Sequence, residues 1–508
     1  MTPPTRIVIA GGGTAGWMAA NLFVRRWGAA GTTITLVESP DIGTIGVGEG
    51  STPTLKRFFG LLGIDDSEWM PRCQATYKVG IRFDGWSPSS GVDRYRHPFT
   101  SQPDVFVQQS FMTNCRTRRL GLDVHTRPDD FFLNGILAEK SLSPVAPPNF
   151  PFEIDYGYHF DAGKLGEYLR EVAIGRGVVH QQARITEVIR ADNGSIDRLV
   201  TDAGTLSGDL FVDCTGFGSL LLQKTLGVPF RSFGDNLFNN AAVALPGDAQ
   251  PGPVPSETVS EALSNGWCWI IPLRHRVGYG YVYSSDFLSA DAAETELRRR
   301  IGDLDGRREA RHLRMRVGQV ARHWEKNCLA CGLSQGFIEP LEATALLLVQ
   351  VSLELFMREI DESGGDDRGR ERFNALIGER FERVRDYIVA HYKLNTRDDS
   401  DYWRANRNND TLSDSLRSIL DVWYRGEDLF AEIQRQNLES HFGALSWHSL
   451  LAGYGVFPEI APNQPGRGDL YAEKNLAEFL AGCALNFESH RDALGVGSPS
   501  DNAGAGSQ

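Results

Sequence analysis

The chain has 508 residues, of which 41% are hydrophobic, and a formal net charge of −13 at pH 7, as is typical of a globular protein with more than one core region. Its acidic balance and the lack of a Lys/Arg-rich block argue against nucleic acid and an anionic membrane as partners, and favour a small-molecule site. No apolar run reaches the ~18 residues of a membrane span, and no charged and then apolar leader precedes the first strand, so we expect a cytoplasmic protein.

The N-terminal segment RIVIAGGGTAGWMAANLFVRR predicts a strand, a glycine-rich turn and a helix. Residues 6–10 are a buried run typical of a parallel strand, and residues 15–26 have helix-forming composition. Between them, Gly11, Gly13 and Gly16 fit G-x-G-x-x-G, in which the glycines allow a tight turn, the approach of a pyrophosphate and close helix packing. The pattern predicts a dinucleotide site, with a purely structural βαβ turn as the alternative.

A second predicted strand strengthens the dinucleotide interpretation. It covers residues 33–37 and ends at Glu38, which lies 22 residues after Gly16. An acidic side chain at this place is expected to bind the ribose hydroxyls of a dinucleotide.

Two further segments favour FAD over NAD. The loop GTIGVGEGSTP, residues 43–53, is rich in glycine and leads into a helix with a proline in its first turn, so it can follow a long cofactor. Far along the chain, DLFVDCTGFGSLL, residues 209–221, predicts a buried strand ending at Asp213 and a turn with two glycines. Alone, this segment is also typical of an ordinary αβ loop. Together with the N-terminal turn, it predicts a flavin-binding domain assembled from distant pieces.

The segment GWCWIIPL, residues 266–273, carries two tryptophans two positions apart. It is apolar and β-prone and is closed by a proline, so we predict a strand in which Trp267, Trp269 and Ile271 share one face. Such a pair is either core packing or the wall of a site.

The segment TYKVGIRF, residues 76–83, alternates apolar side chains with Lys78, Gly80 and Arg82. This alternation predicts a strand with Lys78 and Arg82 on one face. From this stretch alone, a solvated strand face is the favoured interpretation.

Residues 334–356 run from an irregular Gly-Phe-Ile-Glu-Pro segment into a helix that is apolar on nearly every side, as is typical of a protein interior. Glu342 lies just before or within the first turn of this helix. A carboxylate there can stabilise the helix end by at most about 1 kcal/mol. Alternatively, the free N–H groups of a buried helix start can hold an anion or the electron-rich edge of a flavin.

The seven cysteines are scattered along the chain and do not suggest a disulfide framework, so we expect reduced thiols. Cys328 and Cys331 form a C-x-x-C, but neither a second pair nor a histidine cluster accompanies it. No metal site is therefore predicted.

In their order and spacing these segments resemble the flavin-dependent tryptophan halogenase family over most of the chain. The matching segments are GGGTAGWMAA, IGVGEGSTP, TYKVGIRF, YHFDA, DLFVDCTGFGSLL, GWCWIIPL, NCLACGLSQGFIEPLEAT and HYKLNTRDDSDYW. The joint presence of the double-tryptophan strand and PLE-x-T is the most specific feature. A flavin-dependent aromatic hydroxylase, which also uses G-x-G-x-x-G, is the alternative enzyme. A non-catalytic flavin-binding protein is the alternative outside enzymes.

The resemblance implies an α/β fold with an FAD-binding, Rossmann-like domain of the GR2 flavin monooxygenase type, an inserted substrate-side sheet and a mainly helical C-terminal region. We expect the discontinuous FAD domain and its inserted sheet over residues 1–340, and the helical region that covers the substrate over residues 341–494. Residues 495–508 are small and polar, which predicts a disordered tail.

The resemblance also implies a reaction in two places. FADH2, delivered by a separate flavin reductase, would react with O2, and a bound chloride or bromide ion would be converted to hypohalous acid. The oxidant would then pass to a small, electron-rich aromatic substrate such as an indole or tryptophan. Lys78 would capture the halogenating species, and Glu342 would lie near it as a positioning group or as the base that takes the proton from the substrate. The sequence leaves a homodimer open.

The resemblance further implies the residues that bind each partner. Trp267 and Trp269 would line the substrate site and separate it from the flavin, and His97 and Phe99 would contact the substrate. The backbone N–H groups of Thr344 and Ala345 would hold the halide. The implied FAD contacts are Gly11, Gly13, Thr14, Ala15, Gly16, Glu38, Gly48, Glu49, Gly50, Ser51, Ile185, Asp213, Gly216, Phe337 and Leu346.

Some positions depart from the family pattern. Many members have PLE-S-T-G where this chain has Ala343, Thr344 and Ala345. The Cβ of Ala345 adds bulk and disfavours positive φ, so we expect bromide to be handled at least as well as chloride. His97-Pro98-Phe99 resembles the family's His-x-Phe, which stacks on an indole, and a surface loop is the alternative. Residues 424–447 match the family's tryptophan-gripping loop poorly, so another indole or a phenol is as well supported as free tryptophan.

Overall fold

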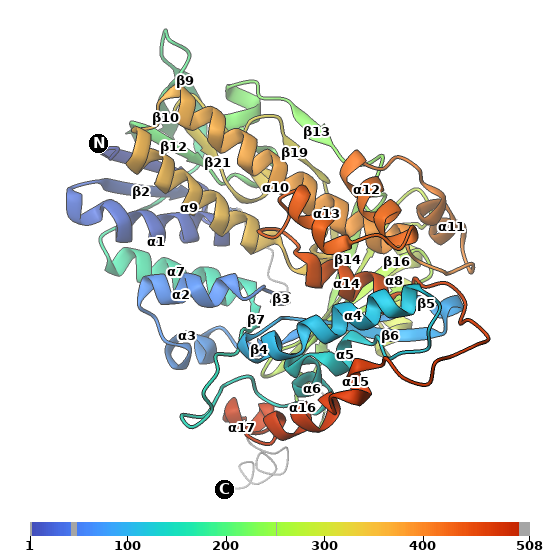
Figure 1. The fold of residues 1–508 in the computed structure, drawn as a ribbon. Helices are drawn as coiled ribbons and strands as arrows, with labels where there is room; N and C mark the ends of the chain where they lie inside the picture. The colour runs from blue at the N-terminus through green and yellow to red at the C-terminus, as the bar shows by residue number, and fades with distance from the viewer. Residues whose placement is uncertain (1–2, 42–47, 250, 497–508) are drawn as a thin grey trace, which may run out of the picture. The chain divides into compact units, whose positions relative to one another are not determined.

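The structure is a computed structural model that describes residues 3–41, 48–249 and 251–496 (Figure 1). Most of the predicted glycine-rich loop, residues 43–47, and the predicted tail from residue 497 onward lie outside the described residues. The chain forms two compact units, each assembled from three segments. Unit 1 comprises Met1–Gln74, Phe160–Leu237 and Met315–Arg385, and unit 2 comprises Ala75–His159, Phe238–Arg314 and Asp386–Gln508.

Unit 1 is built on a mainly parallel sheet. Its strands lie in the order β20 (Trp324–Glu325), β21 (Cys328–Ala330), β12 (Leu210–Asp213), β1 (Arg6–Ala10), β2 (Thr33–Glu38) and β8 (Val179–Gln182). Only the edge pair formed by β20 and β21 is antiparallel among the described strands of this sheet. The two strands predicted at the N-terminus and the strand ending at Asp213 are thereby confirmed, and they lie side by side.

Helices cover one face of this sheet and a second sheet covers the other. The helix α1 (Thr14–Trp27) packs on β1 and β2 and also contacts α7 (Ala162–Gly175) and α9 (Ala345–Ser363), as Figure 1 shows. On the other face, Val8 and Phe211 join an apolar cluster with Leu199 of the antiparallel sheet β11-β10-β9. The remaining elements of unit 1 are β3 (Gly48–Gly50), α2 (Thr54–Leu62), α3 (Asp66–Arg72), β9 (Ile185–Arg190), β10 (Ile196–Thr201), β11 (Gly204–Ser207), β13 (Phe230–Ser232), β19 (Gly318–Val320) and β22 (Gly336–Phe337).

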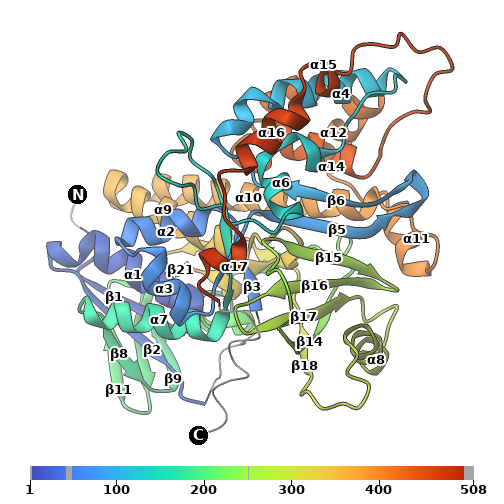
Figure 2. The same cartoon turned by 90° about the horizontal axis from the view of Figure 1, so that it is seen from below.

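Unit 2 is built on a larger, mainly antiparallel sheet, which Figure 2 shows from below. Its strands lie in the order β18 (Arg311–Arg314), β14 (Ala241–Asp248), β17 (Arg276–Tyr283), β16 (Gly266–Pro272), β15 (Thr258–Leu263), β5 (Gly80–Ser87) and β6 (Val92–Pro98). The predicted double-tryptophan strand is confirmed as β16, and it lies in the middle of the sheet between β15 and β17.

The two faces of this sheet differ in what covers them. Val243 and Cys268 pack on one face against Leu297 of α8 (Ala290–Ile301), which lies beside β14 and β17 in Figure 2. On the other face, the ring of Phe83 stacks on His391 with 4.6 Å between ring centroids. This second face therefore carries packed aromatic rings, and we call it the aromatic face.

The C-terminal part of the chain is mainly helical, as predicted. The helices of unit 2 are α4 (Gln108–Arg119), α5 (Pro128–Phe131), α6 (Leu133–Glu139), α8, α11 (Asp401–Asn408), α12 (Asp414–Tyr424), α13 (Leu429–Arg435), α14 (Ala444–Gly453), α15 (Leu470–Glu473), α16 (Leu476–Ala484) and α17 (His490–Ala493). The chain passes from unit 1 to unit 2 within α10 (Asp367–Lys393). Among the described residues, no helix has both the length and the apolar character needed to cross a membrane.

Two details differ from the sequence-based expectations. The continuous strand predicted for residues 76–83 is wrong, because the chain breaks at Val79 into β4 (Thr76–Lys78) and β5. β4 pairs with β7 (Gly157–Asp161), whereas β5 pairs with β6 and β15, so Lys78 and Arg82 do not belong to one strand. In addition, α9 packs with α1 in unit 1, although we assigned it to the region that covers the substrate.

Candidate active site

The turn after β1 needs glycine at two of its predicted positions. Gly11 has a φ of +108°, and a Cβ there would lie 2.2 Å from the carbonyl oxygen of Cys214. A Cβ on Gly16 would lie 2.0 Å from the carbonyl oxygen of Gly11, so this glycine lets α1 approach the turn. At Gly13, by contrast, a Cβ would meet no described atom within 4 Å. The turn therefore leaves open space at the N-terminus of α1, where Thr14 and the following residues begin the helix and where a phosphate is favoured.

Glu38 ends β2 beside this turn. Its carboxylate reaches the space next to Gly12, where a Cβ would lie 1.6 Å from Oε2 of Glu38. Oε1 lies 2.7 Å from Nε2 of His180, and both side chains are only partly exposed. His180 follows Val179 in β8, the strand that pairs with β2, so only the strand order could have identified this contact. A carboxylate oriented in this way is suited to accept hydrogen bonds from ribose hydroxyls.

The side chain of Asp213 organises the second predicted loop from within. It is fully buried, and its two oxygens accept hydrogen bonds from the backbone N–H groups of Leu221 and Leu222, both at 2.8 Å, and from the hydroxyl of Thr215 at 2.6 Å. Gly216, with a φ of +67°, provides the turn that these bonds require. The carboxylate of Asp213 therefore shapes this loop and is engaged by its own chain.

The other expected FAD contacts belong to several elements of unit 1. Burial raises the pKa of Glu49 to about 7, and the charge of Asp161 adds to this effect. Glu49 can therefore donate a hydrogen bond near neutral pH. Gly48, Glu49 and Gly50 form β3, and Ser51 follows this strand in a buried position. Ile185 begins β9, and Phe337 ends β22 with its ring edge-on to that of Phe217. Leu346 lies buried in the first turn of α9.

The PLE-x-T segment forms a tight turn before α9. Glu342 is buried in the short 3-10 turn Pro340–Glu342, and Ala343 has a φ of +55°. Thr344 is buried, and no described atom hydrogen-bonds its hydroxyl. Ala345 begins α9. The argument from positive φ does not apply to Ala345, because the left-handed residue of this turn is Ala343, and Ala345 has a helical backbone in which a Cβ carries no such strain. The turn thus presents the free N–H groups of a buried helix start.

The double-tryptophan strand has its indoles on the aromatic face of the unit 2 sheet. Trp267 and Trp269 are 1% and 7% exposed, with ring centroids 6.3 Å apart, whereas Cys268 points into the opposite core. A Cβ on Gly280 would lie 1.9 Å from Cζ2 of Trp269, so this indole lies directly over the glycine of β17. Trp269 lies opposite Ser260 of the neighbouring strand β15. Its indole N–H is buried and has no hydrogen-bond acceptor among the described residues. The predicted shared face is thereby confirmed.

Register places His97 on the same face as Trp269. His97 lies opposite Ile81, which in turn lies opposite Thr258. Thr258 and Ser260 are two positions apart on β15, so their side chains point the same way. Ser260 is the residue opposite Trp269. The surface-loop alternative for His97 is therefore excluded, because this side chain is buried in a strand.

Lys78 is fully buried at the end of β4, which excludes the solvated-face alternative. Its Nζ lies 5.4 Å from the centroid of the ring of Phe99, a partly buried residue just beyond β6. The backbone N–H of Phe99 donates to the carbonyl of Val79, the residue after Lys78, at 2.9 Å. A buried ammonium over an aromatic ring is stabilised by cation–π attraction but is costly to keep away from water, as is common at functional sites.

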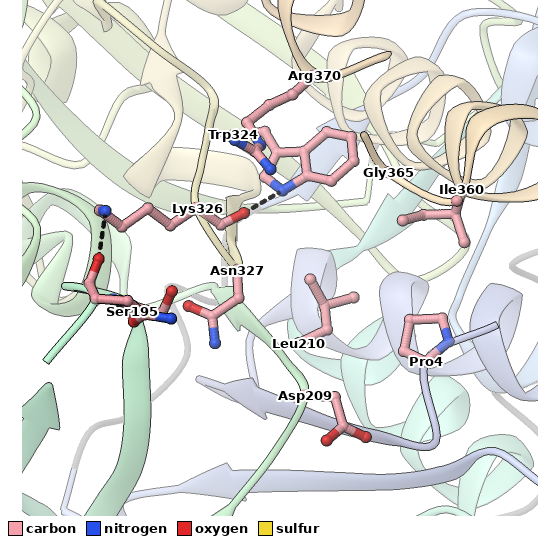
Figure 3. Close-up of a pocket in the computed structure, with 12 residues that line it drawn as sticks. Pro4, Ser195, Asp209, Leu210, Trp324, Lys326, Asn327, Ile360, Gly365 and Arg370 are labelled. Carbon is pink, nitrogen blue, oxygen red and sulfur yellow. Dashed lines mark hydrogen bonds between the residues drawn. The ribbon is translucent and has the colours of Figure 1, made fainter. Parts of the chain in front are cut away.

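A separate cavity of about 480 Å³ lies in unit 1, and Figure 3 shows the residues that line it. Pro4 and Leu210 line it, and they lie at the amino ends of β1 and β12, whereas dinucleotides bind at the carboxyl ends of such strands. Its Lys326 donates to the carbonyl of Asn193 at 2.7 Å. The cavity therefore lies away from the predicted cofactor turn.

The structure thus groups the predicted residues into two sets. The cofactor and halide residues, with Glu342, all belong to unit 1, and Lys78, His97, Phe99, Trp267 and Trp269 belong to unit 2. Sequence analysis did not identify His180, Gly280 or His159. His180 and Gly280 reach the predicted residues through the pairing of distant strands. His159 belongs to the matching segment YHFDA, for which no role was predicted.

An α/β unit with a glycine-rich dinucleotide turn, accompanied by a second unit that has a buried lysine on β4 and paired tryptophans on its large sheet, defines a flavin-dependent halogenase. A solved flavin-dependent halogenase from Xanthomonas campestris has the same fold, with a TM-score of 0.81 and 34% identity over 97% of this chain and 98% of that one. The chain belongs to the tryptophan halogenase family, whose model matches residues 6–465.

Relatives of known activity support the same assignment. The 7-chloro-L-tryptophan 6-halogenase of Kutzneria sp. (strain 744) is 38% identical in an alignment of 442 residues that covers 82% of this chain and 84% of that protein. The tryptophan 7-halogenase of Lentzea aerocolonigenes is 34% identical in an alignment of 482 residues that covers 89% of this chain and 90% of that protein.

Proposed function

We propose that this protein uses FADH2, O2 and a chloride or bromide ion to halogenate an electron-rich aromatic compound such as an indole or tryptophan. The balanced reaction converts FADH2, O2, the aromatic compound, halide and one proton into FAD, the halogenated product and two waters. The observation that carries the proposal is the burial of Lys78 beside Phe99 in the unit that also carries the two tryptophans.

The residues of unit 1 fit a bound FAD. The open space at Gly13 suits the pyrophosphate, and the carboxylate of Glu38 suits the ribose. When bound in reduced form, FAD supplies the activation of O2 by which the halide is oxidised to hypohalous acid. A separate flavin reductase supplies the reduced cofactor.

The halide is held at the start of α9. The backbone N–H groups of Thr344 and Ala345 lie at the helix start, where N–H groups lack partners within the helix, and the hydroxyl of Thr344, which has no partner among the described residues, is one further donor. Chloride and bromide both fit this donor set.

Lys78 receives the oxidant and aims its halogen at the substrate. An ammonium can hold hypohalous acid by a hydrogen bond, and an amine can carry the halogen as a haloamine. Glu342 positions the oxidant or takes the proton that leaves the ring carbon when the carbon–halogen bond has formed. Trp267 and Trp269 keep the substrate away from the flavin, and His97 and Phe99 stack on its ring.

A reductase-coupled assay tests this function. The purified protein is incubated with a flavin reductase, NADH, FAD and a panel of indoles and phenols, with chloride or bromide, and products are identified by the halogen isotope pattern in mass spectra. Halogenated product that requires both halide and reductase supports the proposal. A hydroxylated product in halide-free buffer would instead show a hydroxylase, and no product with any aromatic compound would favour a flavin-binding protein without this chemistry.

A further inference from the structure

The segment YHFDA contains a buried histidine that has no role in the proposed reaction. His159 is 0% exposed and lies in β7, where it is paired with Thr76 of β4. Lys78 is the last residue of β4 and is paired with Gly157 of β7. Whatever holds His159 and Thr76 together therefore also fixes the strand that presents the lysine.

The hydrogen bonds of His159 allow a single arrangement of protons. The hydroxyl of Thr76 donates to the carbonyl of Pro272 at 2.8 Å, so toward His159 this oxygen can only accept. Nδ1 of His159 lies 3.0 Å from that oxygen and must carry the proton. Nε2 of His159 is then unprotonated, and it accepts the hydroxyl proton of Thr258 at 2.9 Å.

The chain of donors therefore runs from Thr258 through His159 and Thr76 to Pro272, all within unit 2. Thr258 begins β15, and Pro272 ends β16, the strand of the two tryptophans. This chain ties β4 to both of these strands. It thus fixes the position of the lysine strand relative to the aromatic face.

A neutral His159 is also required by its surroundings. Burial lowers its pKa well below 6.5, and the nearby charge of Lys78 and the proximity of His490 lower it further. A protonated ring would have to donate from both nitrogens, which would leave the hydroxyl of Thr258 without its acceptor.

From this geometry we infer that His159 is a positioning residue for Lys78, acting through Thr76 to hold the lysine where it receives and aims the halogen. The inference rests on the proposed function of Lys78. It assigns to His159 no contact with substrate or cofactor.

The matched variants Thr258→Val and Thr258→Ser test the inference in the full-length enzyme. Valine keeps the shape of threonine but removes the donor to His159, whereas serine keeps the donor. In the reductase-coupled assay we expect Thr258→Val to lower halogenated product per FADH2 oxidised by about tenfold, with FADH2 oxidation and the substrate KM within about twofold of the wild type. Thr258→Ser should keep the wild-type ratio of halogenated product to FADH2 oxidised.

The outcome for a purely structural residue is different. If Thr258→Val lowers FADH2 oxidation and halogenation in equal proportion, or leaves the product ratio unchanged while unfolding at the wild-type temperature, the inference is overturned. His159→Phe should give the same loss of product ratio as Thr258→Val, provided that its circular dichroism shows a folded protein.

A measurement without turnover separates this inference from the proposed function. In protein labelled with ¹⁵N-histidine, we expect His159, identified by the loss of its signals in His159→Phe, to be the neutral Nδ1–H form from pH 8 down to pH 6. An Nε2–H or doubly protonated ring at pH 7 would overturn the hydrogen-bond chain even if the enzyme halogenates. A wild-type enzyme that makes no halogenated product would refute the proposed function and leave this result standing.

Discussion

Unit 1 and unit 2 present their candidate residues in different ways. In unit 1 the expected cofactor site is formed largely by backbone: Gly11 and Gly16 are required by close contacts, Gly13 leaves open space, and Asp213 is engaged in shaping its own loop. In unit 2 the expected site is formed by buried side chains such as Lys78 of β4 and Trp269 of β16, which belong to different sheets. A backbone site can be found from glycine spacing, whereas a side-chain site depends on strand order.

The largest effect we predict concerns the backbone site. Gly13→Ala should lower the affinity for FAD about 1,000-fold, or about 4 kcal/mol, because the new Cβ enters the space expected for the pyrophosphate. Stability should not change, since this Cβ meets no described atom within 4 Å. Isothermal titration with FAD and urea unfolding measure the two quantities.

Gly16→Ala is the matched control, and its main effect should be on stability rather than on the affinity for FAD. Its Cβ would lie 2.0 Å from the carbonyl oxygen of Gly11, so we expect about 3 kcal/mol of lost stability. If Gly13→Ala binds FAD as the wild type does, the cofactor turn has been misassigned.

The second prediction concerns the stability of the protein at acid pH, to which histidines of both units contribute. Burial lowers the pKa of His490 and of His448 in unit 2 to about 4, and that of His323 in unit 1 to about 3. Because the unfolded chain binds these protons near pH 6.5 and the folded chain does not, the stability is complete above pH 6.5 and is lost as the pH falls toward 4. His490 alone should account for up to about 3 kcal/mol over this window.

Urea unfolding at several pH values between 7 and 4.5 measures this dependence. In the folded chain, Nε2 of His490 accepts the backbone N–H of Tyr77 at 3.0 Å, which protonation would prevent. His490→Gln should reduce the slope of the free energy of unfolding against pH by about one proton. An unchanged slope would show that His490 is already protonated in the folded state or is equally accessible in both states.

The third prediction isolates one indole of the side-chain site. Gly280→Ala should displace the ring of Trp269, since the new Cβ would lie 1.9 Å from Cζ2, and should lower halogenated product per FADH2 oxidised by about tenfold. Gly247→Ala is the control, because its Cβ would lie 2.4 Å from the ring of Tyr279, which packs with the core at α8. It should cost stability and leave the product ratio unchanged. Equal losses of the ratio in both variants would mean that general distortion of the sheet, and not Trp269, sets the yield.

The extent to which sequence predicted the molecule follows the same division. The first strand, the glycine turn and the double-tryptophan strand were all predicted, because each carries a local pattern of glycines or apolar residues. The break at Val79 was not, since the pairing partners of β4 and β5 are distant in sequence and no local signal separates the two strands.

Contacts that arise from pairing between distant strands could not be predicted either. Sequence gave no indication that Gly280 supports Trp269 or that His180 contacts Glu38, because register and strand order create both contacts. The sequence did not show that the left-handed residue of the turn before α9 is Ala343, two positions before Ala345, because an error of one or two residues at a helix start exchanges a helical and a left-handed backbone.

In the proposed function, oxygen chemistry at the flavin and halogen transfer at Lys78 are separate steps. The variant Lys78→Met tests this separation, because it keeps an unbranched side chain but removes the nitrogen. Its control is Lys474→Met, also in unit 2, where Nζ of the wild-type lysine donates a hydrogen bond only to the hydroxyl of Ser110 among the described residues. FADH2 oxidation and halogenated product are measured together in the reductase-coupled assay. We expect Lys78→Met to oxidise FADH2 at close to the wild-type rate and to make no halogenated product, and Lys474→Met to oxidise FADH2 and make halogenated product as the wild type does. Halogenation by Lys78→Met at the wild-type rate would show that Lys78 does not transfer the halogen.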